Sequence, residues 1–137
     1  MDQRLAPDLV GYDSFMPRPQ ITEEAARQFA QEWIDAWNAH DLESVLGHYA
    51  ADVVLISPMA AKLVPDSGGQ ISGIANLRNY FAQGFAAFPK LRFELIDISA
   101  GPGTLVLLYR NHAGVTVSEF MEVDNAGKVK RVLASYS

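Results

Sequence analysis

The sequence predicts a single α+β domain, and the order of two patterns along the chain carries this prediction. Segments with helical periodicity occupy most of the first half, and β-branched or alternating segments occupy most of the second half. Helices followed by antiparallel strands are typical of α+β folds. The chain has 137 residues, of which 49% are hydrophobic, so one domain with a substantial core is expected.

The first half of the sequence is expected to form three helices. Thr22 is a favourable N-cap for the first, whose apolar residues recur every three or four positions until about Asn38. Asp41 is expected to cap a second, shorter helix, and Gly73 precedes a third that ends at Pro89. The predicted apolar faces are Ala26, Phe29, Ala30, Trp33 and Trp37; Leu42, Val45, Leu46 and Tyr49; and Ile74, Leu77, Phe81, Phe85 and Phe88.

The strands are predicted from β-branched runs and from turn residues. Residues 53–56 form an apolar, β-branched run that stops at Pro58, and residues 59–72 are expected to be largely loop. After the third helix, four further strands are separated by turns that contain glycine, which is typical of a meander. Their expected ranges are 91–99, 104–112, 115–123 and 128–136.

Residues 1–20 differ from the rest and are expected to form an N-terminal arm, with the domain itself spanning 21–137. Three prolines interrupt this segment, and it lacks the basic start and continuous apolar stretch of a secretory signal. We therefore predict no export and a cytoplasmic location. Its apolar residues favour an arm that packs on its own domain or on a partner subunit, and a frayed terminus is the alternative.

Composition excludes several functional classes. The formal net charge is −5, and no basic stripe is present, so a nucleic-acid-binding surface is not expected. There is no cysteine, which removes disulfides, thiolate metal sites and thiol nucleophiles. The longest apolar runs, such as 105–108, are too short to span a membrane. The three histidines are scattered without metal-ligand spacing, so neither a metal nor a cofactor is predicted.

Several short motifs together resemble the nuclear transport factor 2-like superfamily over residues 22–137, most closely its SnoaL-like proteins. They are Trp33-x-x-x-Trp37-Asn38-Ala39-His40-Asp41-Leu42, Tyr49-Ala50-x-Asp52, Ser72-Gly73 before a helix, the exit at Pro89, and Gly127-Lys128-Val129 at a strand start. The resemblance implies a cone-shaped, curved antiparallel sheet wrapped around three helices, with a cavity inside. It also implies a homodimer, because members commonly pack sheet against sheet.

Members with known chemistry include ketosteroid isomerases, limonene-type epoxide hydrolases, scytalone dehydratases and polyketide cyclases, whereas others have no activity. Matched to the isomerases, the helix tyrosine falls on Trp33, the base on Ser57 and the protonated acid on Glu119. A second isomerase tyrosine falls on Phe81, and Tyr80 beside it is expected to face elsewhere. Since serine is not a usable base unless a partner activates it, a standard ketosteroid isomerase is not expected.

The match to the epoxide hydrolases loses an essential group in the same way. Their late aspartate falls on Ala134 and their asparagine on Ser57, while Arg110 is a loose counterpart of their arginine. That mechanism is therefore not expected either.

The candidate acid–base group comes from the predicted meander. A two-residue turn at 113–114 places Arg110, His112 and Glu119 on one face of the sheet, which we expect to be the concave one. A slip of one residue reverses every side chain, and Tyr109 and Asn111 then point inward instead. The other interpretation is a charge network on the solvent-facing or dimer-facing side.

The remaining predicted cavity residues are mostly apolar or aromatic, which suits a small hydrophobic or aromatic ligand. They are Trp33, Trp37, Ser57, Met59, Phe81, Phe85, Val132, Ala134 and Tyr136. Two functions remain open at this level. One is an enzyme that transfers protons without a cofactor, in an isomerisation, cyclisation, dehydration or hydrolysis, with Glu119 as acid or base. The other is a ligand-binding or dimerisation module without chemistry.

Overall fold

The computed structural model describes residues 18–137, so most of the arm predicted at 1–20 lies outside the described residues. Of that segment, Pro19 contacts the domain, because its carbonyl oxygen accepts a hydrogen bond of 2.8 Å from the backbone of Gly103. Within residues 18–137, no helix has both the length and the apolar character needed to cross a membrane.

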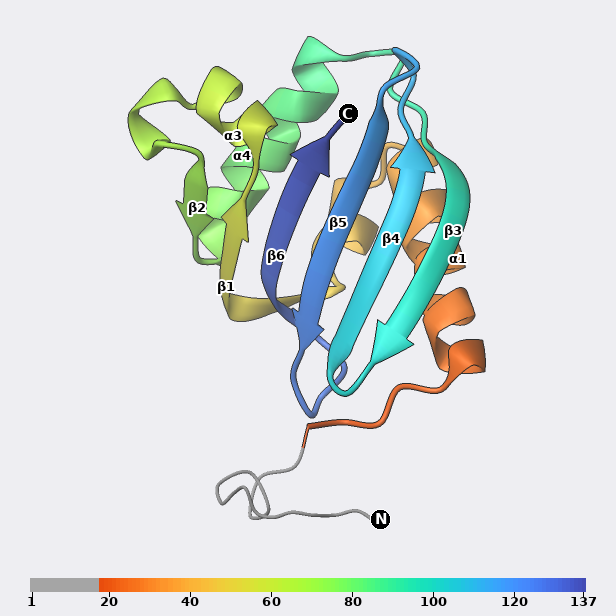
Figure 1. Cartoon of the computed structure of the whole chain (residues 1–137). Coiled ribbons are helices and arrows are strands. Elements are labelled where there is room, and N and C mark those ends of the chain that lie inside the picture. Colours follow the sequence, from red (N-terminus) through yellow and green to blue (C-terminus); the bar gives the residue numbers. More distant parts are fainter. Residues whose placement is uncertain (1–17) are drawn as a thin grey trace.

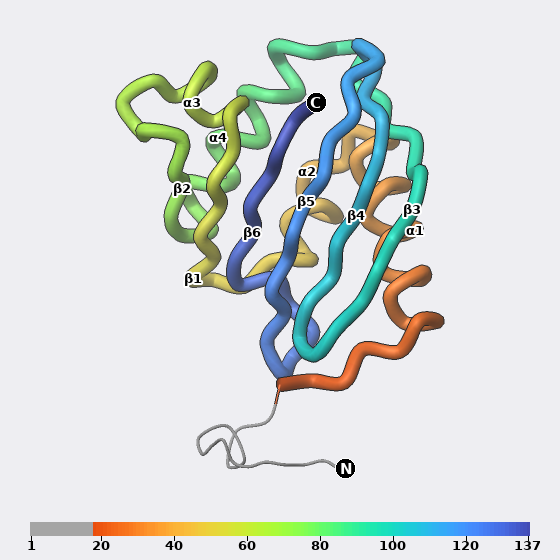
Figure 2. Tube along the Cα trace, in the orientation of Figure 1, coloured from red at the N-terminus to blue at the C-terminus, as the bar shows by residue number. Residues whose placement is uncertain are grey.

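The predicted α+β class is confirmed: helices cover one face of a curved six-stranded sheet (Figure 1). The strands lie in the order β2-β1-β6-β5-β4-β3, and all neighbours are antiparallel except β1 and β6. This parallel pair brings together two segments that are far apart in the sequence (Figure 2). The strands are β1 (Tyr49–Ile56), β2 (Gln70–Ser72), β3 (Glu94–Gly101), β4 (Thr104–Arg110), β5 (Thr116–Val123) and β6 (Val129–Tyr136).

The first two helices begin at the predicted caps. In α1 (Glu23–Asn38) the Thr22 hydroxyl accepts a hydrogen bond from Ala25 N at 3.0 Å, and in α2 (Leu42–Leu46) the Asp41 carboxylate caps Ser44 N. The prediction that Tyr49 belongs to the second helix is wrong. The helix ends at Leu46, and Tyr49 is the first residue of β1.

The prediction that 59–72 is largely loop is also wrong. The segment contains α3 (Pro58–Leu63), a 3₁₀ turn (Pro65–Ser67) and β2. Ser57 caps α3 by accepting a hydrogen bond from Met59 N at 3.1 Å, and Pro58 occupies the first turn, where its missing N–H costs nothing. Pro58 therefore ends one element and also starts the next.

Helix α4 (Ile74–Ala87) follows Gly73 as predicted, but the next strand begins three residues later than expected. The side chain of Asn38, at the end of α1, accepts from Phe93 N at 2.7 Å and donates to Phe93 O at 3.0 Å. His40 also bonds the carbonyl of Leu91 at 2.9 Å. Residues 91–93 thus bond to the end of α1 rather than to β4.

The register of β4 and β5 differs from the prediction by one residue. Tyr109 lies opposite Val117 and Arg110 opposite Thr116, because the hairpin loop has three residues rather than two. The Asn111 side chain accepts hydrogen bonds from Ala113 N and Val115 N, and Gly114 has a φ of 80°. Glycine favours this left-handed conformation, which is typical of a three-residue hairpin with a bulge.

The hydrophobic core fills the space between the helices and the concave face of the sheet. Its largest fully buried side chains are Trp33, Leu77, Leu107, Met121, Val45, Val53, Val117, Val129 and Val132. The core does not extend to the end of the sheet beside α3 and α4. A cavity remains there.

Candidate functional site

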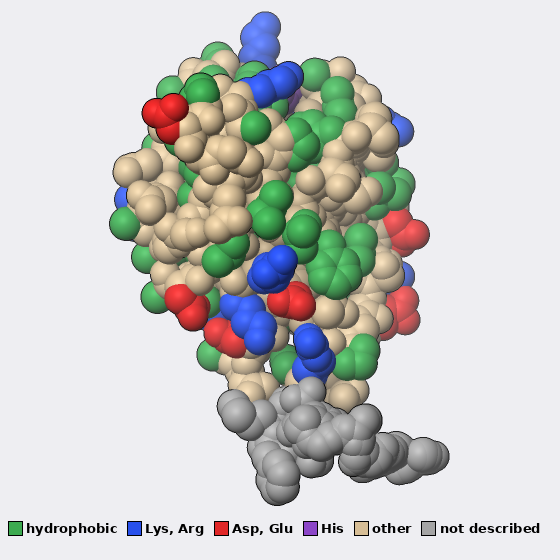
Figure 3. All heavy atoms as spheres, turned by 60° about the vertical axis from the view of Figure 1, so that its left-hand side comes forward, with side chains coloured by type: hydrophobic (Ala, Val, Ile, Leu, Met, Phe, Trp, Pro, Cys, Tyr) green, Lys and Arg blue, Asp and Glu red, His purple; other side chains and the backbone are tan. Residues whose placement is uncertain are grey.

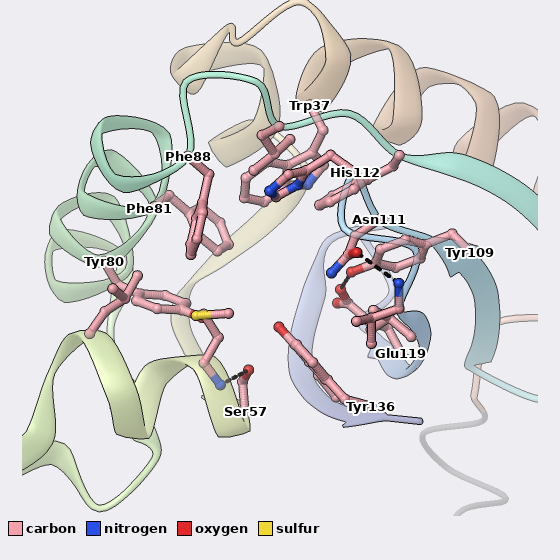
Figure 4. A pocket seen from close by; sticks show the side chains of 18 of the residues that line it. Trp37, Ser57, Tyr80, Phe81, Phe88, Tyr109, Asn111, His112, Glu119 and Tyr136 are labelled. Atoms are coloured by element: carbon pink, nitrogen blue, oxygen red, sulfur yellow. Dashed lines mark hydrogen bonds between the residues drawn. The ribbon is translucent and has the colours of Figure 1, made fainter.

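A cavity of about 290 Å³ lies between α3 and α4 on one side and the concave face of the sheet on the other (Figure 4). Its volume is at the lower end of the roughly 300–1,000 Å³ of small-molecule sites. Most of its wall is apolar or aromatic. These lining residues are Trp37, Tyr49, Leu55, Met59, Leu63, Tyr80, Phe81, Phe88, Leu91, Phe93, Tyr109, Val115, Val117, Ala134 and Tyr136.

Glu119, on the inner face of β5, is the one carboxylate among the described residues that line the cavity. Only 8% of its surface is exposed, and it accepts a hydrogen bond from the hydroxyl of Tyr109 on β4. Burial raises the pKa of Glu119 from 4.5 to about 7, since the charged form loses its hydration, while the Tyr109 bond opposes this rise. A carboxyl that titrates near neutral pH both accepts and returns protons readily.

Two buried tyrosines, Tyr109 and Tyr49, lie within the electrostatic influence of Glu119 and keep their own hydroxyl protons at neutral pH. Burial, followed by the nearby charge of Glu119, raises the pKa of both Tyr109 and Tyr49 well above the ordinary phenol value. Tyr109 therefore remains a hydrogen-bond donor at neutral pH. The Tyr49 hydroxyl accepts a hydrogen bond of 3.0 Å from Trp33 Nε1, which links α1 to β1.

Three hydroxyl groups lie together on another part of the wall: Ser57 at the end of β1, Tyr80 on α4 and Tyr136 at the end of β6. Burial raises the pKa of both phenols, and the Ser57 hydroxyl lies close enough to each to oppose that rise. In Figure 4, Ser57 and Tyr80 lie across the cavity from Glu119, and the Tyr136 hydroxyl points into the space between.

The cavity lining includes many of the residues predicted for it. Those that line it are Glu119, His112, Trp37, Ser57, Met59, Phe81, Ala134 and Tyr136. Trp33 and Val132 are fully buried in the core behind the wall. Phe85 packs against Trp37, with ring centroids 5.1 Å apart, and is outside the lining as well.

The prediction that Arg110 faces the cavity is wrong, because the one-residue register shift turns it to the outer face of the sheet. Its side chain is 48% exposed, and its guanidinium lies 3.6 Å from the carboxylate of Glu94. His112 is in the hairpin loop at the rim of the cavity, where its ring contacts Phe88 at a centroid distance of 5.4 Å. The predicted trio of Arg110, His112 and Glu119 is therefore not assembled.

The expectation that Tyr80 faces away is wrong too. Tyr80 is 8% exposed and lines the cavity, since it lies three residues after the buried Leu77 and one before Phe81 on α4. Because residues three or four positions apart lie on the same side of a helix, this spacing could have predicted the inward position of Tyr80. Tyr109 also lines the cavity, although the predicted two-residue turn placed its side chain on the outer face. Asn111 could have indicated the longer loop, because asparagine side chains form turns of this kind.

The polar residues Lys62, Asn111 and His112 also line the cavity, whereas one polar atom of an aromatic wall residue is buried away from it. Trp37 Nε1 is buried and has no hydrogen-bond partner among the described residues. Its ring packs edge-on against Phe81, with centroids 4.8 Å apart. No group of three His, Cys, Asp or Glu side chains within residues 18–137 is arranged to hold a metal ion.

Comparison with protein families matches residues 30–132 to the SnoaL-like domain. No curated protein matches the chain. Among solved structures, a SnoaL-like protein of unknown function from Burkholderia thailandensis E264 is 34% identical, with a TM-score of 0.82 over 87% of this chain and 99% of that chain.

Two more distant structures share the fold. An NTF-2 like protein of unknown function from Burkholderia xenovorans LB400 is 23% identical, with a TM-score of 0.65 over 86% of this chain and 87% of its own. A candidate ketosteroid isomerase from Kribbella flavida DSM 17836 is 19% identical, with a TM-score of 0.64 over 83% and 78%. Since the family match spans most of the sequence, the chain belongs to the SnoaL-like domain family.

Proposed function

We propose that the protein binds a small, largely apolar molecule in this cavity and transfers a proton on it, with Glu119 as the acid–base group and without a cofactor. The position of Glu119 carries the proposal. A single carboxyl group, buried in an apolar wall and with its pKa raised to about 7, is suited to accept and return a proton. Structural roles for charged side chains seldom need such burial.

Family chemistry supports a reaction of this kind but not a standard ketosteroid isomerase. One neighbour of similar fold is described as a candidate isomerase of that type, although its 19% identity supports the fold alone. The positions matched with family bases carry Ser57 and Ala134 here, neither of which titrates near neutral pH. The alternative is a binding module without chemistry, which the same cavity also permits.

Gly84 offers a direct test of ligand binding. It lies on α4 in the cavity wall, and a Cβ atom built there meets no other atom within 4 Å. A Gly84→Leu substitution is expected to occupy the cavity and to weaken binding of tetralin, an apolar bicyclic hydrocarbon, more than about tenfold. Stability should not fall, because leucine favours the helix over glycine.

Calorimetric titration of tetralin into the wild type and the variant measures this effect, and Gln83→Leu adds the same side chain to the exposed neighbouring position. Equal affinities in wild type and Gly84→Leu would contradict binding in the cavity. No detectable binding to the wild type would contradict an apolar ligand of this size.

We also propose that the protein is a homodimer formed through the outer face of its sheet. Four apolar side chains lie in register across β1, β6, β5 and β4: Ile56 pairs with Leu133, Leu133 with Phe120, and Phe120 with Val106. Phe120 is 42% exposed. Figure 3, which turns the β1–β2 side of Figure 1 forward, shows hydrophobic side chains across the middle of the surface and charges of both signs below them. Contiguous apolar surface of this kind is typical of an interface.

A Phe120→Glu substitution is expected to convert the proposed dimer into a monomer, because it places two carboxylates against an apolar partner face. Light scattering coupled to size-exclusion chromatography gives the mass directly. Gln83→Glu adds the same charge to the exposed side of α4 and should leave the mass unchanged. A monomeric wild type, or a variant that remains dimeric, would rule out this interface.

A further inference from the structure

A second cleft, of about 300 Å³, adjoins the mouth of the cavity and differs from it in chemistry. Phe93, Asn111 and His112 belong to the walls of both, so the two clefts meet at these residues. The rest of the second cleft is formed by charged residues, and we call it the arginine groove: Arg92, Glu94 and Arg110. A molecule that fills the apolar cavity and extends past the shared residues therefore meets two guanidinium groups.

Arg92 lies in a segment that is anchored on both sides to the end of α1. The Asn38 side chain bonds both backbone groups of Phe93, at 2.7 and 3.0 Å. His40 bonds the carbonyl oxygen of Leu91 at 2.9 Å. The backbone of Arg92 is therefore held in place before a ligand arrives, which lowers the entropy cost of binding.

The arginine groove carries an excess of positive charge, although the formal net charge of the chain is −5. The Arg110 guanidinium lies 3.6 Å from the Glu94 carboxylate, and this pair is exposed, so water screens it and it holds Arg110 only weakly. Within residues 18–137, no carboxylate lies within ion-pair distance of Arg92. Two guanidinium groups and one carboxylate leave one positive charge when His112 is neutral, which matches a singly charged anion.

An anionic group suits the mouth of the cavity and not its interior. The interior wall is mostly apolar and already contains the carboxyl group of Glu119, so a second negative charge there would lose its hydration and be repelled. At the mouth the lining side chains are basic or neutral, because Lys62 of α3 and His112 of the hairpin loop both line it. An apolar molecule with one anionic end is therefore expected to enter with its apolar end first.

We infer that the ligand of this cavity is an apolar carboxylic acid, whose body fills the cavity and whose carboxylate is bound in the arginine groove by Arg92 and Arg110. This inference rests on the proposed function and narrows its apolar ligand to one chemical class. Guanidinium groups donate paired hydrogen bonds that fit the two oxygens of a carboxylate. Binding of the carboxylate outside also fixes the orientation of the ligand, so that its apolar end lies beside Glu119.

Two probes of the same shape isolate the contribution of the charge. 4-Phenylbutyrate and 4-phenylbutanamide share a phenyl ring and a flexible chain, but only the first is ionised at neutral pH. In calorimetric titrations at about 0.05 M salt, the wild type is expected to bind the carboxylate about tenfold more tightly than the amide. This ratio should shrink when the salt is raised to about 0.5 M, because exposed ion pairs are screened.

Variants separate the groove from the cavity. In the double variant Arg92→Gln/Arg110→Gln the ratio is expected to fall to about one, while the affinity for the amide is kept. Arg92→Gln alone should lower the ratio about threefold, and it gives the comparison if the double variant does not fold. The control Arg27→Gln removes the same charge from an exposed residue of α1 outside both clefts, and it should leave the ratio unchanged. Gly84→Leu should weaken both probes by the same factor, because it fills the cavity and leaves the groove intact.

Each result has a definite meaning. No binding of 4-phenylbutyrate, a ratio near one in the wild type, or an undiminished ratio in the glutamine variants overturns the carboxylate site. In these cases tetralin binding leaves the proposed apolar cavity in place. If the glutamine variants weaken 4-phenylbutyrate but Gly84→Leu does not, one molecule does not occupy both clefts, and the inference is wrong. Failure of the wild type to bind tetralin overturns the proposed function together with the inference.

Discussion

Replacing Glu119 with glutamine is expected to slow hydrogen exchange in D₂O at the α-carbons of 2-tetralone, a ketone with the carbon skeleton of tetralin. The expected loss is about 10²- to 10⁴-fold relative to the wild type. The amide occupies nearly the same volume and keeps a hydrogen-bond acceptor for Tyr109, but it cannot take a proton. Exchange is followed by loss of the α-proton NMR signals. Since only the proton acceptor is removed, binding of tetralin should persist in the variant.

The pH profile of the wild type gives a second readout of the same group. The carboxylate is the active base, so the exchange rate should rise with pH through about 7 and then level off. The hydrogen bond from Tyr109 lowers the pKa of Glu119, so Tyr109→Phe should move the midpoint to higher pH. A merely structural role for Tyr109 would change the rate without moving the midpoint.

Glu94→Gln is the matched control, because Glu94 is an exposed carboxylate on the outer face, paired with Arg110. Its exchange rate should equal that of the wild type. Equal rates in the wild type and Glu119→Gln would remove Glu119 as the base. A wild-type rate no faster than buffer, with tetralin still bound, would instead support the binding module without chemistry.

A Trp33→Ala substitution is expected to lower the free energy of unfolding by about 3–5 kcal/mol, because it leaves a large void in a packed core. Trp33 has no exposed surface, and its ring stacks on Phe93 at 5.8 Å and contacts Tyr109 at 5.5 Å. The change also removes the donor to the buried Tyr49 hydroxyl. Urea denaturation measures this loss. The slope of the unfolding free energy against urea concentration should be the same in the variant and the wild type.

Two comparisons make this result specific. Glu32→Ala, at the exposed neighbouring position of α1, should change stability by less than about 0.5 kcal/mol. Trp33→Phe should retain tetralin binding, because Trp33 lies behind the cavity wall rather than in it. A loss below about 1 kcal/mol in Trp33→Ala would show that α1 does not pack against the sheet as described.

Much of the fold followed from local patterns. The caps Thr22 and Asp41 each predicted a helix start, and Gly-containing turns predicted the boundaries within the meander to within two residues. Such signals are local, because a cap or a tight turn involves residues only a few positions apart. Helix α3 was missed although Ser57 and Pro58 form a favourable start, since Pro58 also ends the preceding strand.

The candidate site was less predictable, because it depends on how elements are rotated against one another. Glu119 and Ser57 were assigned to the cavity from the sequence, and both line it. Tyr80 and Trp33 were assigned to the wrong sides of the wall, since a helical stripe gives the direction of the core but not the position of a void within it.

By itself, the sequence determined the order and type of most elements, the α+β class and the apolar character of the cavity wall, all of which depend on composition and short-range periodicity. The tertiary structure decided which side chains meet inside. The Asn111 side chain closes a three-residue loop, and this one extra residue turns Tyr109 toward Glu119 and Arg110 away from it. Because strand side chains alternate with a period of two, a single loop residue exchanges the inner and outer faces of one strand of the hairpin relative to the other.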